Sequence, residues 1–268
     1  MVGIVKKPIV SVFSKPSENS EMTDEVLHGW SVKILAETGN FYYIETDYGY
    51  NGYVKRDTLS FSSQIINYYN SEKNIVVSNF TDILQEPNFK SKILENIPKG
   101  SYIYGFEEDG DYAKVMLASN IFGYICSKSI KKIQKSLSYD KIDATNQKKL
   151  RIDIIDIAGG YFKTGYRWGG KTCLGIDCSG LSFMSYFLLG INIYRDAKIM
   201  PNFPIKKIPI SNIKPADLIF FSGHVAIFIG DGAFIHSSLY NNGVDINFFG
   251  DTYFNTMQPK LLYGGSIF

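Results

Sequence analysis

The N-terminal half of the chain contains one pattern of turns twice. Proline and glycine mark matching positions in the two copies, namely Pro16, Gly29, Gly39 and Gly52 in the first and Pro87, Gly100, Gly110 and Gly123 in the second. Within each copy the spacings are 13, 10 and 13 residues, and the second copy follows the first by 71 residues. Because these two residue types favour turns for steric reasons, their agreement in register indicates one turn scaffold used twice.

Short runs of β-branched and aromatic residues lie between these turns and are typical of strands. Two copies of about 60 residues with such strands predict two small all-β barrels. Each copy resembles the bacterial SH3-like domain, with a Pro-containing loop and a closing Gly-Tyr-Val at 52–54 or Gly-Tyr-Ile at 123–125. We place these domains at residues 1–62 and 72–135. They either only pack against and rigidify a neighbour, or one of them supplies part of a ligand site or docks a glycan or peptide.

The charge of the chain is close to balanced. Its 268 residues include 28 Lys and Arg against 26 Asp and Glu, a net charge of +2, which gives no electrostatic reason to expect a nucleic acid or an anionic membrane as partner. Three cysteines cannot form a disulfide framework, and the start of the chain lacks the apolar core of a secretory signal. We therefore expect a soluble, monomeric, cytoplasmic protein, secreted only if a leader is missing.

A third domain follows a polar segment. Residues 136–149 have few large apolar side chains and are interpreted as a linker, so the third domain spans 150–268. Leu150, Ile154 and Ala158 recur at a spacing of four residues, which predicts an amphipathic helix at its start.

The sequence Asp-Cys-Ser-Gly at 177–180 stands out in this domain, because an apolar run with helical spacing follows it. Asp177 can cap that helix, which places Cys178 in the first turn, where the helix dipole and unpaired N–H groups favour the reactive thiolate. Cys173 and Cys126 have no second cysteine cluster with which to bind zinc, and we expect both to be buried or inert thiols.

A thiol nucleophile needs a base, and the chain has three histidines. Two strand-like runs, each containing one histidine, flank the turn sequence Gly-Asp-Gly at 230–232, so an antiparallel hairpin would bring His224 and His236 to the same end. They form a base and its orienting partner, or two hydrogen-bonded strand-end histidines without a catalytic role. His28 lies in the first repeat and is interpreted as a surface loop residue.

Five motifs of the third domain occur in an order that resembles the NlpC/P60 family of papain-like cysteine peptidases. They are Tyr-Arg-Trp-Gly-Gly from Tyr166, Asp-Cys-Ser-Gly, Pro-Ala-Asp-Leu-Ile-Phe-Phe, Gly-His-Val-Ala-Ile-Phe-Ile-Gly and Ile-His-Ser-Ser. The resemblance implies Cys178 as nucleophile, His224 as base, His236 as the residue that holds the imidazole, and Tyr166 as an oxyanion donor. No metal or other cofactor is required. The fold expected is a multidomain chain of two SH3-like barrels followed by an α+β papain-like domain.

This domain combination resembles endopeptidases that cut peptidoglycan stem peptides between γ-D-glutamate and an L-diamino acid. In that group an SH3-like module narrows the site and acidic groups hold the free amine of L-Ala, so the expected partner is a released murein peptide. The resemblance implies substrate-binding roles for Asp177, Ser179, Trp168, Arg195, Glu25 and Tyr50, with Asp24 as an alternative acid.

Three points stay open. Asp177 could be only a helix cap, or cap and ligand at once. Ala197 stands where the group commonly has a serine, which puts one substrate hydrogen bond in doubt. The diamino acid could be lysine or diaminopimelate, and the alternatives in function are a secreted enzyme that cuts intact cell wall and a non-catalytic wall-binding protein.

Overall fold

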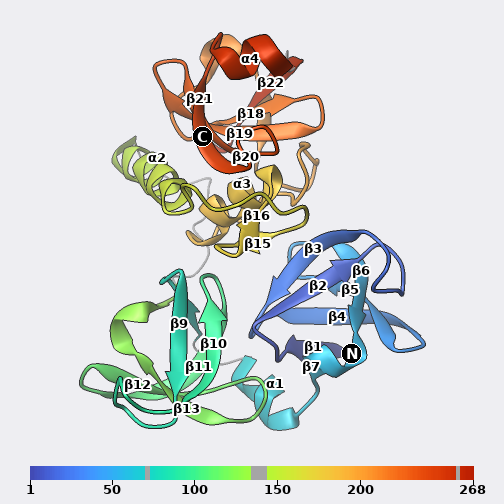
Figure 1. Ribbon diagram of the computed structural model, residues 1–268, viewed down its shortest axis with the longest axis vertical. Helices are drawn as coiled ribbons and strands as arrows, with labels where there is room; N and C mark the ends of the chain where they lie inside the picture. Colours follow the sequence, from blue (N-terminus) through green and yellow to red (C-terminus); the bar gives the residue numbers. More distant parts are fainter. Residues whose placement is uncertain (70–72, 134–143, 258–259) are drawn as a thin grey trace. The chain divides into compact units, whose positions relative to one another are not determined.

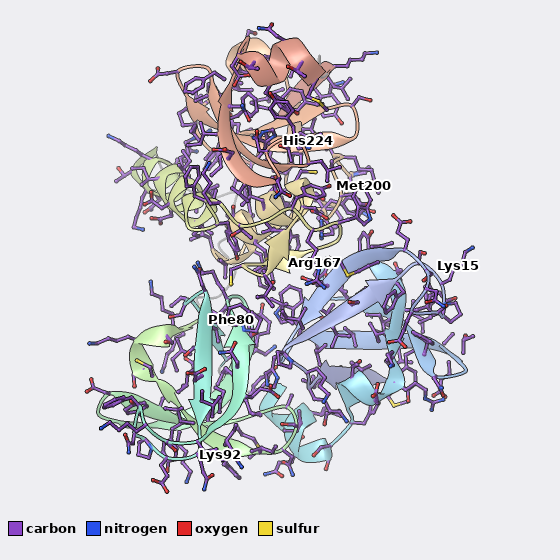
Figure 2. All side chains as sticks on the ribbon, viewed as in Figure 1. Lys15, Phe80, Lys92, Arg167, Met200 and His224 are labelled. Carbon is purple, nitrogen blue, oxygen red and sulfur yellow. The ribbon has the colours of Figure 1, made fainter. Side chains whose placement is uncertain are left out.

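A computed structural model describes residues 1–69, 73–133, 144–257 and 260–268. The chain divides into two compact units, Met1–Ile133 and Gln134–Phe268, each of which has its own interior of packed side chains (Figures 1 and 2). Among the described residues, no helix is both long enough and apolar enough to cross a membrane.

The first repeat forms a seven-stranded, barrel-like antiparallel sheet. Its elements are β1 (Val2–Val5), β2 (Ile9–Phe13), β3 (Met22–Leu27), β4 (Ser31–Thr38), β5 (Phe41–Thr46), β6 (Asn51–Lys55), the 3-10 helix η1 (Arg56–Thr58) and β7 (Leu59–Ser60). The strand order is β3-β2-β6-β5-β4-β1-β7. In β2 the buried residues alternate with half-buried ones, so Val10 and Val12 face the interior, as expected of a strand with one face in the core.

The second repeat has the same plan. Its elements are β8 (Asn74–Val76), β9 (Phe80–Leu84), β10 (Ile93–Pro98), β11 (Tyr102–Asp109), β12 (Tyr112–Met116), β13 (Phe122–Cys126), the 3-10 helix η2 (Ser127–Ser129) and β14 (Ile130–Lys132). The order β10-β9-β13-β12-β11-β8-β14 is that of the first repeat shifted by seven strands. Its core is a cluster of aliphatic side chains around Ile83, Ile103 and Ile125. The duplicated β-barrel predicted from the turn spacing is confirmed.

The two repeats contact each other through a turn of the first. The turn carbonyl of His28 accepts a hydrogen bond from the Tyr102 N–H at 2.9 Å, and Trp30 Nε1 donates to the Gly100 carbonyl at 2.8 Å. Tyr104 Oη donates to the Gly29 carbonyl at 2.6 Å. Helix α1 (Ser63–Tyr69) adds Ile65 to a small apolar cluster that includes residues from both repeats.

The interpretation of His28 as a surface residue is wrong. Its side chain is fully buried, and its Nε2 accepts a hydrogen bond from the Ala118 N–H of the second repeat at 3.1 Å. The position is a turn of the first barrel, as expected, but the second barrel covers it. Burial lowers the pKa of His28 to about 4.

The second unit begins with helix α2 (Ala144–Gly159), which starts earlier than expected. Residues 144–149, predicted as linker, belong to the helix: the polar side chains of 145–149 lie on its exposed or half-exposed side, whereas Leu150, Ile154 and Ala158 are buried. The rest of the predicted linker, together with residues 72, 134 and 135 of the second predicted SH3-like domain, lies outside the described residues.

A six-stranded antiparallel sheet completes this unit, in the order β17-β22-β18-β19-β20-β21. The strands are β17 (Lys206–Ile208), β18 (Leu218–Phe221), β19 (His224–Gly230), β20 (Ala233–Ser238), β21 (Gly243–Phe248) and β22 (Leu261–Ser266). The short strands β15 (Lys171–Thr172) and β16 (Gly175–Ile176) pair separately, and the remaining elements are η4 (Ile210–Asn212) and α4 (Thr252–Met257). Helix α3 (Cys178–Phe187) is buried along its whole length against β19 and β20, and α2 packs on α3 (Figure 1).

Candidate active site

Cys178 is the first residue of the buried helix α3, and Asp177 caps that helix. Asp177 Oδ1 accepts the Gly180 N–H at 2.6 Å and Oδ2 accepts the Gly169 N–H at 2.7 Å. The carboxylate therefore ties the glycine-rich loop before the helix to its first turn. The predicted cap is confirmed, and it fixes the backbone on both sides of Cys178.

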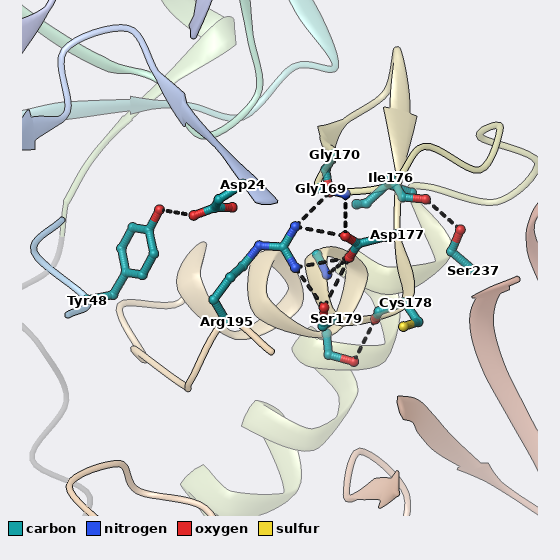
Figure 3. Close-up of polar contacts among 12 residues, drawn as sticks. Asp24, Tyr48, Gly169, Gly170, Ile176, Asp177, Cys178, Ser179, Arg195 and Ser237 are labelled. Atoms are coloured by element: carbon teal, nitrogen blue, oxygen red, sulfur yellow. Dashed lines mark hydrogen bonds and ion pairs between the residues drawn. The ribbon is translucent and has the colours of Figure 1, made fainter. Parts of the chain in front are cut away.

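Arg195 forms a buried ion pair with the same carboxylate (Figure 3). Its guanidinium, 1% exposed, donates to Asp177 Oδ1 and Oδ2 at 3.0 Å each and to Ser179 Oγ at 2.7 Å. Burial acts to raise the pKa of Asp177, but the Arg195 charge and the two backbone donors outweigh it and hold that pKa below its ordinary value. The sequence reasoning grouped Asp177, Ser179 and Arg195 as substrate ligands; the structure brings them together as partners of one another.

The thiol of Cys178 is enclosed and protonated. Burial, followed by the charge of Asp177, raises its pKa to about 11, although the Val225 and Ser179 N–H groups and Arg195 act in the opposite direction. The backbone N–H groups near the helix N-terminus favour the thiolate, as expected, but in this state of the protein desolvation exceeds their contribution. A nucleophilic thiolate here requires a base that takes the proton.

The two histidines meet at one end of the predicted hairpin. Asp231 and Gly232 form its turn with φ values of 50° and 74°, as a two-residue turn with both residues left-handed requires. His224 Nε2 and His236 Nδ1 are 2.7 Å apart. Burial, followed by the neighbouring His236, lowers the pKa of His224 to about 3, and burial also lowers the pKa of His236. Both rings are therefore neutral at pH 7, so each carries one ring proton.

Asn247 is a member of this constellation that sequence reasoning missed. It lies on β21, and its Oδ1 is 2.9 Å from His236 Nε2. Strand β21 pairs with β20 so that Phe234 faces Asn247 in the ladder. The available signal was the turn sequence Asn-Asn-Gly at 241–243 after the histidine strand, which is typical of a second hairpin and would have placed β21 beside His236.

Tyr166 and Trp168 lie in the loop that leads to β15. Tyr166 is half-buried, and burial, together with the nearby Cys178 and Asp177, raises its pKa, so its hydroxyl remains a hydrogen-bond donor. Trp168 is 58% exposed and precedes Gly169, whose N–H binds the Asp177 carboxylate.

A small cavity of about 10 Å³ adjoins the nucleophile helix. Ser179, Ile199, Met200, Phe203 and Val225 are among the residues that line it, and Figure 2 labels Met200. A space of this volume holds a single water or a group of similar size.

The remaining candidates, Glu25 and Tyr50, lie in the first unit. Glu25 is buried on β3, and the Tyr50 N–H donates to Thr46 Oγ1 at 2.9 Å. A neighbouring pair is bonded directly, because Tyr48 Oη donates to Asp24 Oδ2 at 2.5 Å (Figure 3). Roles of these residues toward a substrate remain predictions.

Cys126 and Cys173 are half-buried, so of the expected alternatives, buried or inert, full burial does not hold and inertness stays a prediction. Cys126 ends β13 and Cys173 follows β15, positions at which a strand leaves its sheet and side chains reach solvent. Ala197 is also half-buried, two residues after Arg195.

Comparison with known proteins gives consistent results. The sequence model of the NlpC/P60 family matches residues 163–261, and that of the bacterial SH3 domain matches residues 10–60. Dipeptidyl-peptidase 6 of Lysinibacillus sphaericus is 35% identical over 253 residues, which are 92% of this chain and 91% of the relative. Gamma-D-glutamyl-L-lysine dipeptidyl-peptidase of Bacillus cereus is 24% identical over 85% of this chain and 70% of its own length.

A solved structure shares the fold over the whole chain. The crystal structure of an NlpC/P60 family protein from Bacillus cereus superposes with a TM-score of 0.82 and covers 98% of both chains, at 17% sequence identity. At this identity the likeness concerns the fold, two SH3-like barrels and a papain-like domain.

Proposed function

The chain belongs to the NlpC/P60 family of cysteine peptidases, and from that premise we propose that it hydrolyses the bond between γ-D-glutamate and the L-diamino acid of murein peptides with a free N-terminal L-Ala. The products are L-Ala-γ-D-Glu and the remainder of the peptide. The names of both dipeptidyl-peptidases that resemble it along most of its length support release of a dipeptide, and the name of the Bacillus cereus relative supports the γ-D-glutamyl-L-diamino acid bond. The observation that carries the proposal is the hydrogen-bonded series His224, His236 and Asn247, together with the Val225 N–H, next to His224 in the chain, which bonds the Cys178 thiol at the helix N-terminus.

In the proposed reaction, His224 Nδ1 takes the Cys178 proton, since the other ring nitrogen is bonded to His236. The thiolate attacks the γ-carbonyl of D-glutamate, and the Cys178 N–H and the Tyr166 hydroxyl stabilise the oxyanion. The C–N bond breaks as His224 returns the proton to the leaving amine. His224 then takes a proton from water, which attacks the thioester and regenerates the thiol.

Recognition of the free amine calls for a carboxylate besides Asp177. The charge of Asp177 is already offset by Arg195, so that pair alone offers an ammonium group little net attraction. An acid from the first SH3-like domain, Glu25 or Asp24, would supply the missing charge. The small cavity beside Ser179 suits a side chain as small as that of alanine.

The proposed role is recycling of released murein peptides by a cytoplasmic monomer. An amine-reading pocket excludes intact cell wall, in which the amino group of L-Ala is bonded to the glycan. A secreted wall-cutting enzyme would need an open cleft instead, and the test below distinguishes the two.

The test is hydrolysis of L-Ala-γ-D-Glu-L-Lys and its diaminopimelate analogue, each free and N-acetylated, followed by mass spectrometry. We expect L-Ala-γ-D-Glu from the free peptides alone. Cys178→Ala is expected to lower hydrolysis at least about 1,000-fold. Cys173→Ala, in the loop that precedes helix α3, is the matched control and is expected to keep activity. Equal cleavage of free and acetylated peptides, or turnover by the Cys178 variant, would contradict the proposal.

A further inference from the structure

We propose that Asn247, held by Asp251, sets which nitrogen of each catalytic histidine carries the proton, and is therefore a positioning residue for the base. This inference rests on the proposed reaction at Cys178, in which His224 must accept a proton. It extends the site by two residues that lie beyond the histidine pair.

The Asp251 carboxylate fixes the orientation of the Asn247 amide. Asn247 Nδ2 donates to Asp251 Oδ2 at 2.8 Å, and the same oxygen accepts the Phe248 N–H at 2.9 Å. Because a carboxylate only accepts hydrogen bonds, the NH₂ group of Asn247 faces Asp251 and its oxygen faces His236. Asn241 Nδ2 donates to that oxygen at 2.6 Å and favours the same orientation.

The orientation of the amide then propagates through both rings. Asn247 Oδ1 accepts a hydrogen bond from the Nε2–H of His236, so His236 Nδ1 bears the lone pair. His236 Nδ1 accepts from His224 Nε2, so the lone pair of His224 lies on Nδ1. With the amide reversed, each step would invert and His224 Nδ1 would already carry a proton. A base in that form could not take the proton of Cys178.

Burial of His236 stabilises this distribution of protons between the ring nitrogens. His236 is fully buried, and the rings of Phe234 and Tyr253 pack against it with centroids 5.1 and 4.9 Å away. These rings limit the access of water, which could otherwise serve either ring nitrogen as donor or acceptor. Besides His224 and Asn247, Asn241 reaches this ring, with its Nδ2 3.4 Å from His236 Nε2, a longer contact than the 2.9 Å to Asn247 Oδ1. Asp245 and Asp251 are the charged groups that act on the His236 pKa, and both raise it.

Kinetics of two substitutions test the proposal. Asn247→Leu preserves volume and removes the acceptor, and we expect kcat to fall about 100-fold with KM within about twofold, because the base is misprotonated while the peptide pocket is unchanged. Asn247→Asp places two carboxyl groups about as close as the present amide and Asp251, 2.8 Å, so the pair holds one proton between them. That proton takes the place of the amide N–H toward Asp251 and leaves an acceptor toward His236, so kcat stays within about tenfold. Asn255→Ala, on the neighbouring helix α4, is the control, because its exposed amide donates to the Gly250 carbonyl.

A spectroscopic readout separates positioning from folding. The chain has three histidines, so ¹⁵N-histidine labelling of the full protein gives three imidazole spectra. We expect His224 and His236 protonated at Nε2 in the substrate-free protein, and His28 at Nδ1, since its Nε2 accepts a hydrogen bond. Asn247→Leu should alter the first two and leave His28, in the first unit, unchanged. Thermal unfolding followed by near-ultraviolet circular dichroism, compared with the native protein, reports whether the second unit of the variant is folded.

The two proposals fail in different ways. Expected proton positions with no cleavage of either peptide would overturn the proposed function and uphold this inference. Unchanged kcat in Asn247→Leu, or a proton on His224 Nδ1 in the native protein, would overturn this inference and leave the peptidase activity standing.

Discussion

The two SH3-like repeats have the same strand order but different polar interiors. Position 24 of the first corresponds to 95 of the second, and position 25 to 96, by the 71-residue offset. Asp24 and Glu25 are fully buried, whereas Glu95 is half-buried and Asn96 is exposed. Burial of a charged group is costly unless a partner offsets it, as Tyr48 Oη does for Asp24. These buried acids are the feature of the first copy for which we predict a role toward substrate. The strand order is common to both copies, whereas the buried acidic pair belongs to the first copy, where a functional role is expected.

Their contact joins equivalent regions of the two copies that carry different side chains. The first copy contributes the turn at 28–30, and the second contributes Gly100, which corresponds to Gly29, together with Tyr102 and Tyr104 of the strand that follows. The 71-residue offset places Ser31 and Lys33 of the first copy at the positions of these two tyrosines, so one region of the fold carries different side chains in the two copies. Three substitutions examine these differences, each with a control elsewhere in the repeats.

The largest effect is expected at Gly29. It has φ of +77°, and a Cβ there would lie 2.1 Å from the Tyr102 carbonyl oxygen. Gly29→Ala should therefore cost more than about 3 kcal/mol, from left-handed strain and the displaced contact. Gly39→Ala, with φ of +56° and open space around it, should cost about 1 kcal/mol. Urea unfolding followed by Trp30 fluorescence measures both, and equal costs would refute a role of Gly29 in the contact.

The next largest effect is expected in the pH dependence of stability, through His28. Its folded pKa of about 4 lies below the unfolded value of 6.5, so its neutral form contributes stability that is present above pH 6.5 and lost as pH falls toward 4. The loss attributable to this group is about 3 kcal/mol. His28→Gln keeps an acceptor for the Ala118 N–H and should flatten this dependence. Lys99→Gln, at the equivalent position, should leave it intact; a steep acid loss surviving in His28→Gln would contradict the prediction.

The smallest effect is expected in substrate recognition. Asp24→Asn and Glu25→Gln remove one charge each, and loss of a charge-assisted hydrogen bond to the peptide ammonium should raise KM about 10- to 100-fold. Adjacent strand residues point to opposite faces, so we expect the effect in one of the two. Glu95→Gln is the control in the second copy. If neither first-copy variant alters KM, the acidic pair does not bind the ammonium group of the peptide.

Local signals in the sequence were sufficient for much of this structure. Turn residues specified the repeats, and the capping carboxylate of Asp177 and the hairpin between His224 and His236 follow from neighbours in the chain. The burial of His28 depends on contacts about 90 residues away in sequence, with Ala118, and no local pattern encodes it. Asn247 was missed because its role depends on the register of β21 against β20. The pKa of the Cys178 thiol depends on enclosure by the whole domain.

The different accessibility of the three cysteines has a consequence for chemical probes. Cys126 and Cys173 are half-exposed, while Cys178 is 7% exposed and protonated. A small general alkylating reagent would modify the two outer thiols first, so the extent of labelling would be a poor measure of active enzyme. For the proposed substrate, an electrophile carried on an L-Ala-γ-D-Glu scaffold would instead be bound beside Cys178 before it reacts. Selective inhibition of this protein is therefore predicted to depend on the peptide part of an inhibitor more than on its reactive group.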